Sequence, residues 1–163
     1  LIRRLALPEC VLLGRIPGTD HFASLVRHPN AQTVPGVFVF RPNAALLYFN
    51  ADTVRDQMLA LLERRETPLR RIVVDLSFTT DLDLSTIRML ADVARRAQAA
   101  GVAVLLADAH HRVRAVLARE RLGTLLGDLT RAYSIAELVD GLEQEAPAPA
   151  LARARAAERP SDL

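Results

Sequence analysis

Residues 71–90, RIVVDLSFTTDLDLSTIRML, constrain the fold more than any other part of the chain, because their hydrophobic periodicity changes within the stretch. Residues 72–76 form an apolar run with three β-branched side chains, which is typical of a buried strand. From Thr86 onward, apolar residues recur at spacings of three and four, as on an amphipathic helix. Residues 77–83 are rich in Ser, Thr and Asp, whose side chains favour turns and helix starts. The stretch therefore predicts a strand, a loop and a helix in succession.

Four polar side chains of this stretch, Asp81, Asp83, Ser85 and Thr86, are expected at the N-terminus of the predicted helix. Unpaired N–H groups and the positive end of the helix dipole attract acceptors and anions there. Asp83 or Ser85 is therefore expected to cap the helix, which is worth about 1 kcal/mol. The same place suits regulation, because a helix N-terminus would tolerate a phosphate on Ser85 or Thr86, and a protein partner could bind the loop. Capping and regulation are compatible, so both interpretations stay open.

Strand-like and helix-like patterns alternate from residue 46 to residue 142, after a pair of apolar runs. This order predicts an α/β fold with a mixed, mainly parallel sheet of about 4–5 strands and about four helices packed against it. The expected strands are residues 11–16, 37–41, 46–49, 72–76 and 102–107, of which 37–41 and 46–49 form a hairpin. The expected helices follow Asn50, Ser85 and His111 and, through an S-x-x-E capping box of Ser134 and Glu137, begin again near residue 135.

The connections between these elements are also informative. Residues 19–34 show no clear period and are expected to run irregularly over the surface, and residues 123–131 are expected to link two helices. The loops 79–85 and 108–111 both follow parallel strands, so they should meet at the carboxyl edge of the sheet, where α/β folds place their sites. Gly101 is expected to end the helix that begins after Ser85.

The domain organisation is expected to have three parts. Residues 1–10 are interpreted as a juxtamembrane or linker segment, residues 11–145 as one domain, and residues 146–163, rich in Ala, Arg and Pro, as a flexible tail. No run of 18 apolar residues occurs, so the chain itself has no candidate membrane span. Cys10 is the single cysteine, which excludes an internal disulfide and fits a reducing compartment.

Charge and motifs exclude several classes of function. All 21 basic residues are Arg, but 19 acidic residues are interleaved with them and aromatic residues make up 4%, which argues against nucleic-acid binding. No G-x-S-x-G, Walker A or G-x-G-x-x-G motif is present. The four histidines, His21, His28, His110 and His111, lack the spacing of metal ligands. We therefore expect no catalytic residue, no metal, no cofactor and no enzymatic activity, and we expect Asp75, inside a buried strand, to bind loop backbone.

Four stretches of the chain resemble one known family. Residues 71–90 resemble the strand, loop and helix of STAS domains, and VLLGRIPGTDHF, VPGVFVFRPNAALLYFNAD and GVAVLLADAHHRVRAVLARERL resemble the version at the C-terminus of SulP-type (sulfate permease family) anion transporters. The resemblance implies a non-enzymatic module at the cytoplasmic face of the plasma (inner) membrane. It also implies three kinds of partner: the membrane domain of the same polypeptide, a second copy in a homodimer, and a cytosolic regulatory protein.

The loop departs from the second large branch of this family, the bacterial anti-sigma factor antagonists. That branch carries Asp-Ser-Ser-Gly, and its first Ser is phosphorylated, whereas this chain has Asp83, Leu84, Ser85 and Thr86. Because Leu84 cannot accept a phosphate, phosphorylation would have to occur on Ser85 or Thr86. The alternative function is a free-standing, antagonist-like partner-switching protein, with weak binding of a guanine nucleotide whose phosphate would contact Ser85 and Thr86.

Overall fold

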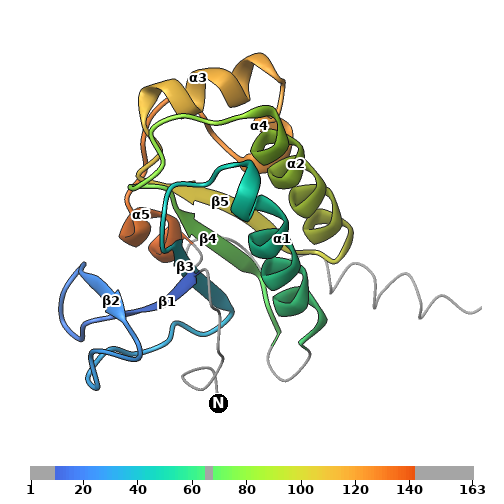
Figure 1. Ribbon diagram of the computed structural model, residues 1–163. Helices are drawn as coiled ribbons and strands as arrows, with labels where there is room; N and C mark the ends of the chain where they lie inside the picture. Colours follow the sequence, from blue (N-terminus) through green and yellow to red (C-terminus); the bar gives the residue numbers. More distant parts are fainter. Residues whose placement is uncertain (1–9, 65–67, 142–163) are drawn as a thin grey trace, which may run out of the picture.

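The computed structural model describes residues 10–64 and 68–141, which build one five-stranded mixed sheet with helices on both faces (Figure 1). The strand order is β2-β1-β3-β4-β5. Among the described strands, β1 alone runs against the others, because it pairs antiparallel with both β2 and β3 while β3, β4 and β5 are parallel. The strands are β1 (Cys10–Arg15), β2 (Phe22–Ser24), β3 (Val37–Pro42), β4 (Arg71–Asp75) and β5 (Ala103–Ala107).

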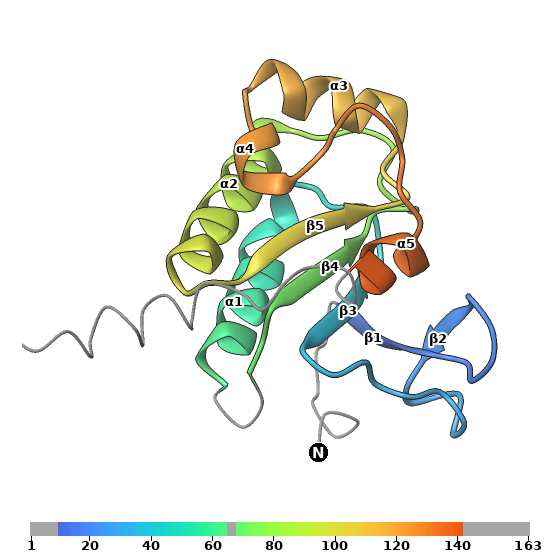
Figure 2. The same ribbon diagram turned by 180° about the vertical axis from the view of Figure 1, so that it is seen from behind.

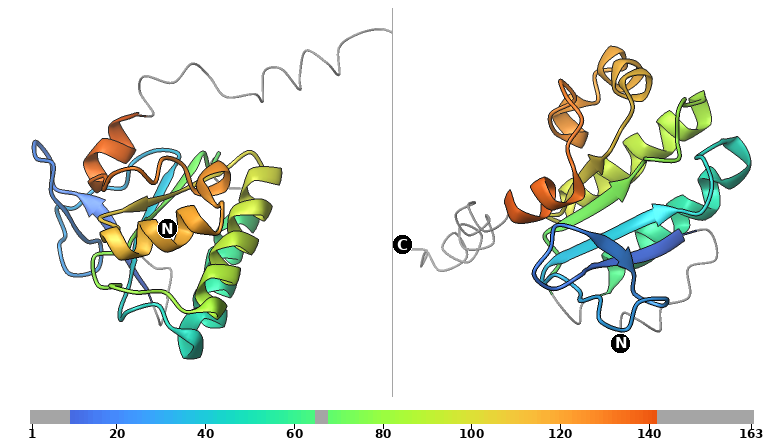
Figure 3. Two further views of the ribbon diagram at one scale, coloured as in Figure 1. Left: turned by 90° about the horizontal axis from the view of Figure 1, so that it is seen from above. Right: turned by 90° about the vertical axis from the view of Figure 1, so that its left-hand side faces the viewer.

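Five helices accompany the sheet in the described residues: α1 (Tyr48–Glu63), α2 (Leu84–Ala99), α3 (His111–Arg119), α4 (Gly123–Leu126) and α5 (Ile135–Asp140). Helices α1 and α2 pack side by side on one face of the sheet. Helix α5 lies on the opposite face (Figures 2 and 3). The predicted α/β class, with a mixed sheet, is therefore confirmed.

The central strand β4 has apolar side chains on both faces of the sheet, so helices must cover both faces. All five of its residues are buried, as expected for an apolar run inside a mainly parallel sheet. Ile72 and Val74 belong to the large core cluster that contains the apolar faces of α1 and α2. Val73 points to the other face, where it packs with Val139 of α5. The prediction of a strand, a loop and a helix over residues 71–90 is confirmed.

The predicted strand at residues 46–49 is wrong, because α1 begins at Tyr48. Asn50, expected as the helix cap, lies in the first turn instead, and its Oδ1 accepts the backbone N–H of Leu47 at 2.9 Å. This capping contact satisfies a backbone donor at the helix start, which an apolar run alone does not reveal. The predicted hairpin is wrong as well, since the antiparallel neighbour of β3 is β1, with Leu13 opposite Val39.

Two other connections contain more regular structure than expected. Residues 19–34 include the short strand β2, and residues 123–131 include the single turn of α4. Gly101 ends α2 as predicted, with a left-handed φ of 78°. The Ser134–Glu137 capping box is also confirmed, with Ser134 Oγ accepting the Glu137 N–H at 3.1 Å. Of the proposed linker, residues 1–9 lie outside the described residues and Cys10 is the first residue of β1; the proposed tail also lies outside the described residues.

Candidate functional site

The carboxyl ends of the parallel strands gather the predicted site at one edge of the sheet. Residues 76–83 leave β4 there, residues 108–110 leave β5, and residues 43–47 leave β3 toward α1. Figure 1 shows α1 and α2 both beginning at this edge. Because Cys10 pairs with Pro42, the antiparallel strand β1 starts at the same edge.

Asp83 joins the starts of the two large helices. It is the N-cap of α2, and its Oδ1 accepts the backbone N–H of Thr86 at 2.8 Å. Its Oδ2 accepts the backbone N–H of Tyr48, the first residue of α1, at 2.6 Å. One carboxylate therefore faces two helix N-termini, whose dipoles both favour a negative charge. Of the two expected caps, Asp83 and Ser85, the structure has Asp83, and its bond to Tyr48 was not foreseen.

The protonation state of Asp83 follows from these contacts. Partial burial raises the pKa of the Asp83 carboxyl, but hydrogen bonds donated by Thr86 and by the backbone of Tyr48 outweigh it and hold the pKa below its ordinary value of 3.8. Asp83 is therefore ionised at neutral pH and brings a fixed negative charge to this edge.

The other three predicted site residues differ in accessibility. Asp81 is exposed, and its Oδ1 accepts the backbone N–H of Leu82 at 2.9 Å. Ser85 is exposed on the first turn of α2, whereas Thr86 is completely buried. The structure thus brings Asp83 and Thr86 together through a backbone bond and leaves Asp81 and Ser85 at the surface. In the folded domain, an enzyme or partner can reach Ser85 but not the side chain of Thr86.

The loop after β4 is anchored at both ends. Asp75 is buried, and its Oδ1 accepts the N–H of Ser77 at 2.9 Å, which confirms the expected bond to loop backbone. Thr79 is also buried, and its hydroxyl oxygen accepts the N–H of Leu46 at 3.1 Å, which ties the loop to the start of α1. His110, the N-cap of α3, lies with Nε2 2.9 Å from the carbonyl oxygen of Ser77. These contacts to α1 and α3 give the loop a fixed shape.

An exposed apolar surface surrounds this loop, and the sequence reasoning did not find it. We call it the apolar rim, defined as Leu47, Tyr48, Phe49, Phe78 and Leu84. Five of the six large hydrophobic side chains exposed in the described residues belong to it; Val26 is the sixth. Tyr48 and Phe49 form an edge-to-face pair with ring centroids 5.8 Å apart, and the Arg41 guanidinium lies 4.9 Å from the centroid of Phe78. In the sequence, the one feature that could have indicated this surface was Phe78, a large apolar residue within a polar loop.

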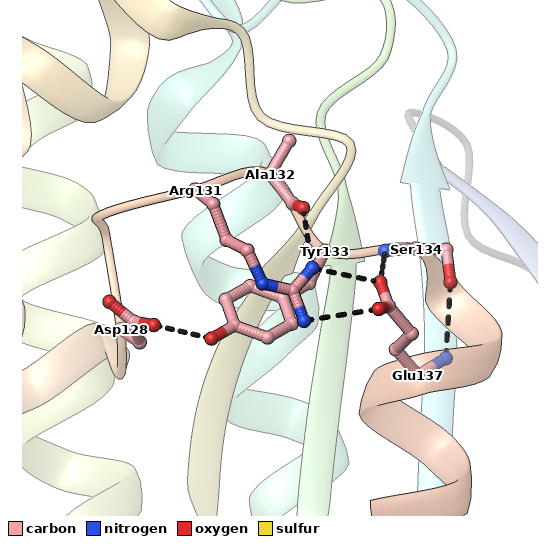
Figure 4. A network of polar contacts seen from close by, with 6 residues as sticks. All are labelled: Asp128, Arg131, Ala132, Tyr133, Ser134 and Glu137. Carbon is pink, nitrogen blue, oxygen red and sulfur yellow. Dashed lines mark hydrogen bonds and ion pairs between the residues drawn. The ribbon is translucent and has the colours of Figure 1, made fainter.

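A second polar cluster holds the last helix in place (Figure 4). The Tyr133 hydroxyl donates to Asp128, the Arg131 guanidinium lies 3.7 Å from the centroid of the Tyr133 ring, and Arg131 pairs with Glu137 at 3.1 Å. Hydrogen bonds from Thr130 and Tyr133 lower the pKa of Asp128 to about 2. Because each of these side chains is bound to another member of the cluster, we assign the cluster a structural role at the start of α5.

The described residues contain no group of three or more His, Cys, Asp or Glu side chains arranged to hold a metal ion. Within the same residues, no helix has the combination of length and hydropathy that crossing a bilayer requires.

Comparison with known proteins identifies the family. The sequence profile described as "STAS domain" matches residues 28–134, which is more than half of the chain, and the chain belongs to this family. High affinity sulfate transporter 2 of Stylosanthes hamata is 24% identical over 147 residues, a match that covers 85% of this chain and 22% of the transporter. The chain thus spans about a fifth of the length of the curated relatives that it matches, and it resembles the STAS domains of SulP transporters.

Solved structures show the same fold in two settings. Murine Slc26a9, an anion transporter solved in the inward-facing state, matches with a TM-score of 0.73 and 19% identity, covering 84% of this chain and 22% of that one. The anti-sigma factor antagonist SpoIIAA in its unphosphorylated form matches with a TM-score of 0.57 and 15% identity, covering 71% of this chain and 96% of that one. At these identities the likeness establishes the fold alone.

Proposed function

We propose that this chain is the cytoplasmic regulatory and protein-interaction domain of a secondary transporter for sulfate or a similar anion. The similarity to sulfate transporters over most of the chain supports the transporter branch. The observation that carries the regulatory role is the apolar rim around Asp83, because monomeric proteins rarely leave so many large apolar side chains exposed at one place without a partner. The domain is then a binding module without enzymatic activity, on the cytoplasmic face of the inner membrane.

The proposed mechanism is a difference in contact energy. A contact at residues 79–90 that is better in one state of the transport cycle than in another shifts the equilibrium between the states by that difference. Couplings of this kind are typically about 1–3 kcal/mol, a 5- to 150-fold change. The bonds from Asp83 to Tyr48 and from Thr79 to Leu46 make the surface rigid, so little binding energy is lost in ordering it.

The test is anion uptake by the polypeptide encoded by the complete reading frame. Leu84→Asp places a charge on a side chain that is 56% exposed, so folding should survive while binding at the rim is lost. Val26→Asp is the matched control, because Val26 is 77% exposed but lies outside the rim. We expect altered sulfate uptake kinetics for Leu84→Asp and unchanged kinetics for Val26→Asp at equal membrane abundance. Identical kinetics in both variants and the wild type would refute the regulatory role.

Ser85 is the regulatory residue that accessibility favours. A phosphate on Ser85 would sit on the first turn of α2, where the dipole favours it, but beside the ionised Asp83. Asp81 and Asp83 are the other two side chains of the proposed contact loop. The buried Thr86 takes part only through its backbone N–H, which donates to Asp83. Mass spectrometry of the protein isolated from its native cells tests this assignment; phosphate on Thr86 alone would contradict it.

The alternative is a free-standing partner-switching protein, of the kind represented by the antagonist SpoIIAA, which has the same fold. Weak guanine-nucleotide binding near Ser85 belongs to this alternative. The two functions differ in their partners, so incubation of the chain with an anti-sigma kinase and ATP discriminates between them. We expect no phosphate transfer and no phosphorylation-dependent release, because Leu84 replaces the antagonist serine. A complex that forms with the kinase and dissociates on phosphorylation of Ser85 would favour the alternative.

A further inference from the structure

A cavity lies at the amino edge of the parallel strands, opposite the edge that carries the apolar rim. Arg15 ends β1 at this edge and Val37 begins β3 there, because the two strands are antiparallel. Arg71 begins β4 at the same edge, because β3 and β4 are parallel. The cavity has a volume of about 510 Å³, which lies within the range of small-molecule sites. The function proposed above does not use it.

The sequence stretches GRIPG, residues 14–18, and VPG, residues 34–36, come together at this cavity, and each contributes a proline to its wall. Two backbone hydrogen bonds join Arg15 to Gln32, since the N–H of each residue donates to the carbonyl of the other at 2.8 Å. The proline rings fix one backbone dihedral each. The wall of the cavity is therefore held in a defined shape before any ligand arrives.

The charged residues that line this cavity are Arg15, Arg70 and Asp140, so two positive charges face one negative charge. Arg15 donates to Asp140 Oδ1 at 2.6 Å, and its Nε is buried with no hydrogen-bond partner in the part of the chain that the structure describes. Arg70 is exposed, and its guanidinium forms no ion pair with any described residue. The hollow next to it along α5 adds two arginines and two acidic residues, which balance. The cavity therefore suits an anion with a single charge.

A second, smaller cavity of about 210 Å³ adjoins the first, because Thr33, Val34 and Pro35 line both. Its walls are mainly apolar and include Phe38 and Leu69, which pack against the large core cluster. An apolar cavity of about 150 Å³ holds a benzene molecule. The smaller cavity therefore has room for an aromatic ring or a short alkyl chain.

Arg70 lies between the two cavities. It lines the larger one, and its side chain passes over Gly36, which lines the smaller one. A Cβ on Gly36 would lie 3.6 Å from Arg70 Cγ, and the left-handed φ of 76° at Gly36 also disfavours a side chain there. A planar guanidinium binds a carboxylate through two parallel N–H bonds. A ligand held in this way at Arg70 can place its apolar part in the smaller cavity.

From these observations we propose that the two cavities form one binding site for a small monocarboxylate that carries an aromatic ring or a short alkyl chain. The carboxylate accepts hydrogen bonds from Arg70, and the positive charge of Arg15 lies on the same wall. The apolar group lies among Val34, Phe38 and Leu69. The site is separate from the apolar rim, so it stands or falls independently of the proposed regulatory function.

Titration of the isotope-labelled chain, followed by two-dimensional NMR of its backbone amides, tests this proposal with phenylacetate and hexanoate as probes. We expect at least one of them to bind with a Kd on the order of 1 mM or tighter, as a ligand of this size allows. Phenylacetamide keeps the ring but has no charge, and acetate keeps the charge but has no apolar group. Each should bind at least about tenfold more weakly, because each loses one half of the site.

Two variants locate the binding. Arg70→Met should weaken the binding of phenylacetate about tenfold or more through loss of a charge-assisted hydrogen bond, whereas Arg95→Met, at an exposed arginine of α2, should leave it unchanged. Thr33→Trp should abolish binding by filling the junction of the two cavities, because Thr33 is exposed and lines both. Thr53→Trp is its matched control, at an exposed threonine of α1.

The amide shifts of the wild type give a readout that does not depend on any variant. The largest changes should fall within residues 15–18, 32–38 and 69–71. Changes centred on residues 78–86 would place the ligand at the opposite edge and overturn the proposal, as would the failure of both probes to bind. Equal affinity for acetate or for phenylacetamide would show that charge or apolar contact acts alone, and unaltered binding by both Arg70→Met and Thr33→Trp would exclude these cavities.

Discussion

The edge around Asp83 and the region around α5 both use polar contacts between distant segments, but they leave different surfaces. Around Asp83, one carboxylate holds the starts of α1 and α2, and the large apolar side chains beside it are exposed. At α5, Arg71 donates to the carbonyl of Leu138 at 2.5 Å and Arg15 pairs with Asp140 at 2.6 Å, while Val139 is buried against the sheet. Polar contacts close the fold at α5, and at Asp83 they shape a surface that stays available.

This difference separates stability from binding. A side chain that closes the fold should affect the free energy of unfolding when it is replaced, because buried groups lose their partners. A side chain of the apolar rim should affect binding and leave the free energy of unfolding nearly unchanged, because it is exposed in the folded domain. Asp83 lies between these cases, since it caps helices and also borders the rim.

Among the polar contacts, the largest effect on stability is expected for Arg71→Met. Arg71 is 6% exposed and donates to the last turn of α5, and a hydrogen bond to a charged group contributes about 1.5–3 kcal/mol. Methionine keeps the length of the side chain but leaves the Leu138 carbonyl without this donor. We expect the free energy of unfolding, measured by urea denaturation, to fall by about 2 kcal/mol. Arg70→Met is the control, because Arg70 is exposed, and an equal loss in both variants would contradict the role of Arg71.

An intermediate effect is expected for Asp83→Ala, which removes the cap of α2 and the acceptor for Tyr48. Loss of an N-cap costs about 0.5–2 kcal/mol, and we expect a value near the top of this range because two helix starts are affected. Asp83→Asn should retain only part of the stability, because its single amide oxygen can cap α2 or accept from Tyr48 but cannot replace both carboxylate oxygens.

The pH dependence of this effect has a definite sign. The pKa of Asp83 is lower in the folded chain than its ordinary value of 3.8, so the charged form stabilises the fold above that pH. The difference in stability between wild type and Asp83→Ala should therefore be largest near neutral pH and shrink as the pH falls below about 4. A difference that is constant from pH 7 to pH 3 would show that the charge of Asp83 contributes nothing.

Much of the fold follows from periodicity, and the wrong strand at residues 46–49 has a physical origin. The run at residues 72–76 and the helix after it have clear periods, and both were predicted correctly. Residues 46–49, Leu-Leu-Tyr-Phe, carry no period within four residues, so the sequence could not show that they start a helix. The helix start there is held by Asn50, whose Oδ1 accepts the N–H of Leu47, and by Asp83, 35 residues away, whose carboxylate accepts the N–H of Tyr48.

Separation along the sequence also explains why the apolar rim was not predicted. Asp83 was recognised as a helix cap because capping is local, but the apolar rim combines residues from α1, the loop after β4 and the start of α2. Because residues 46–49 were interpreted as a strand of a hairpin, Tyr48 and Phe49 were not placed at a helix start beside Asp83, and the exposed surface was not recognised. The exposure of Ser85 and the burial of Thr86 also follow from α2 packing on the sheet.

The smallest effect on stability is expected for the rim itself. Phe49→Ser and Leu84→Ser replace side chains that are 65% and 56% exposed, so each should change the free energy of unfolding by no more than about 0.5 kcal/mol. Leu82→Ser is the matched control, because Leu82 is two residues from Leu84 in the same segment but is 9% exposed within the core, and its loss should cost about 2 kcal/mol or more. Urea denaturation of the three variants measures this contrast. A loss of 2 kcal/mol for Leu84→Ser would mean that the rim supports the fold from within, and its exposure would then no longer point to a partner.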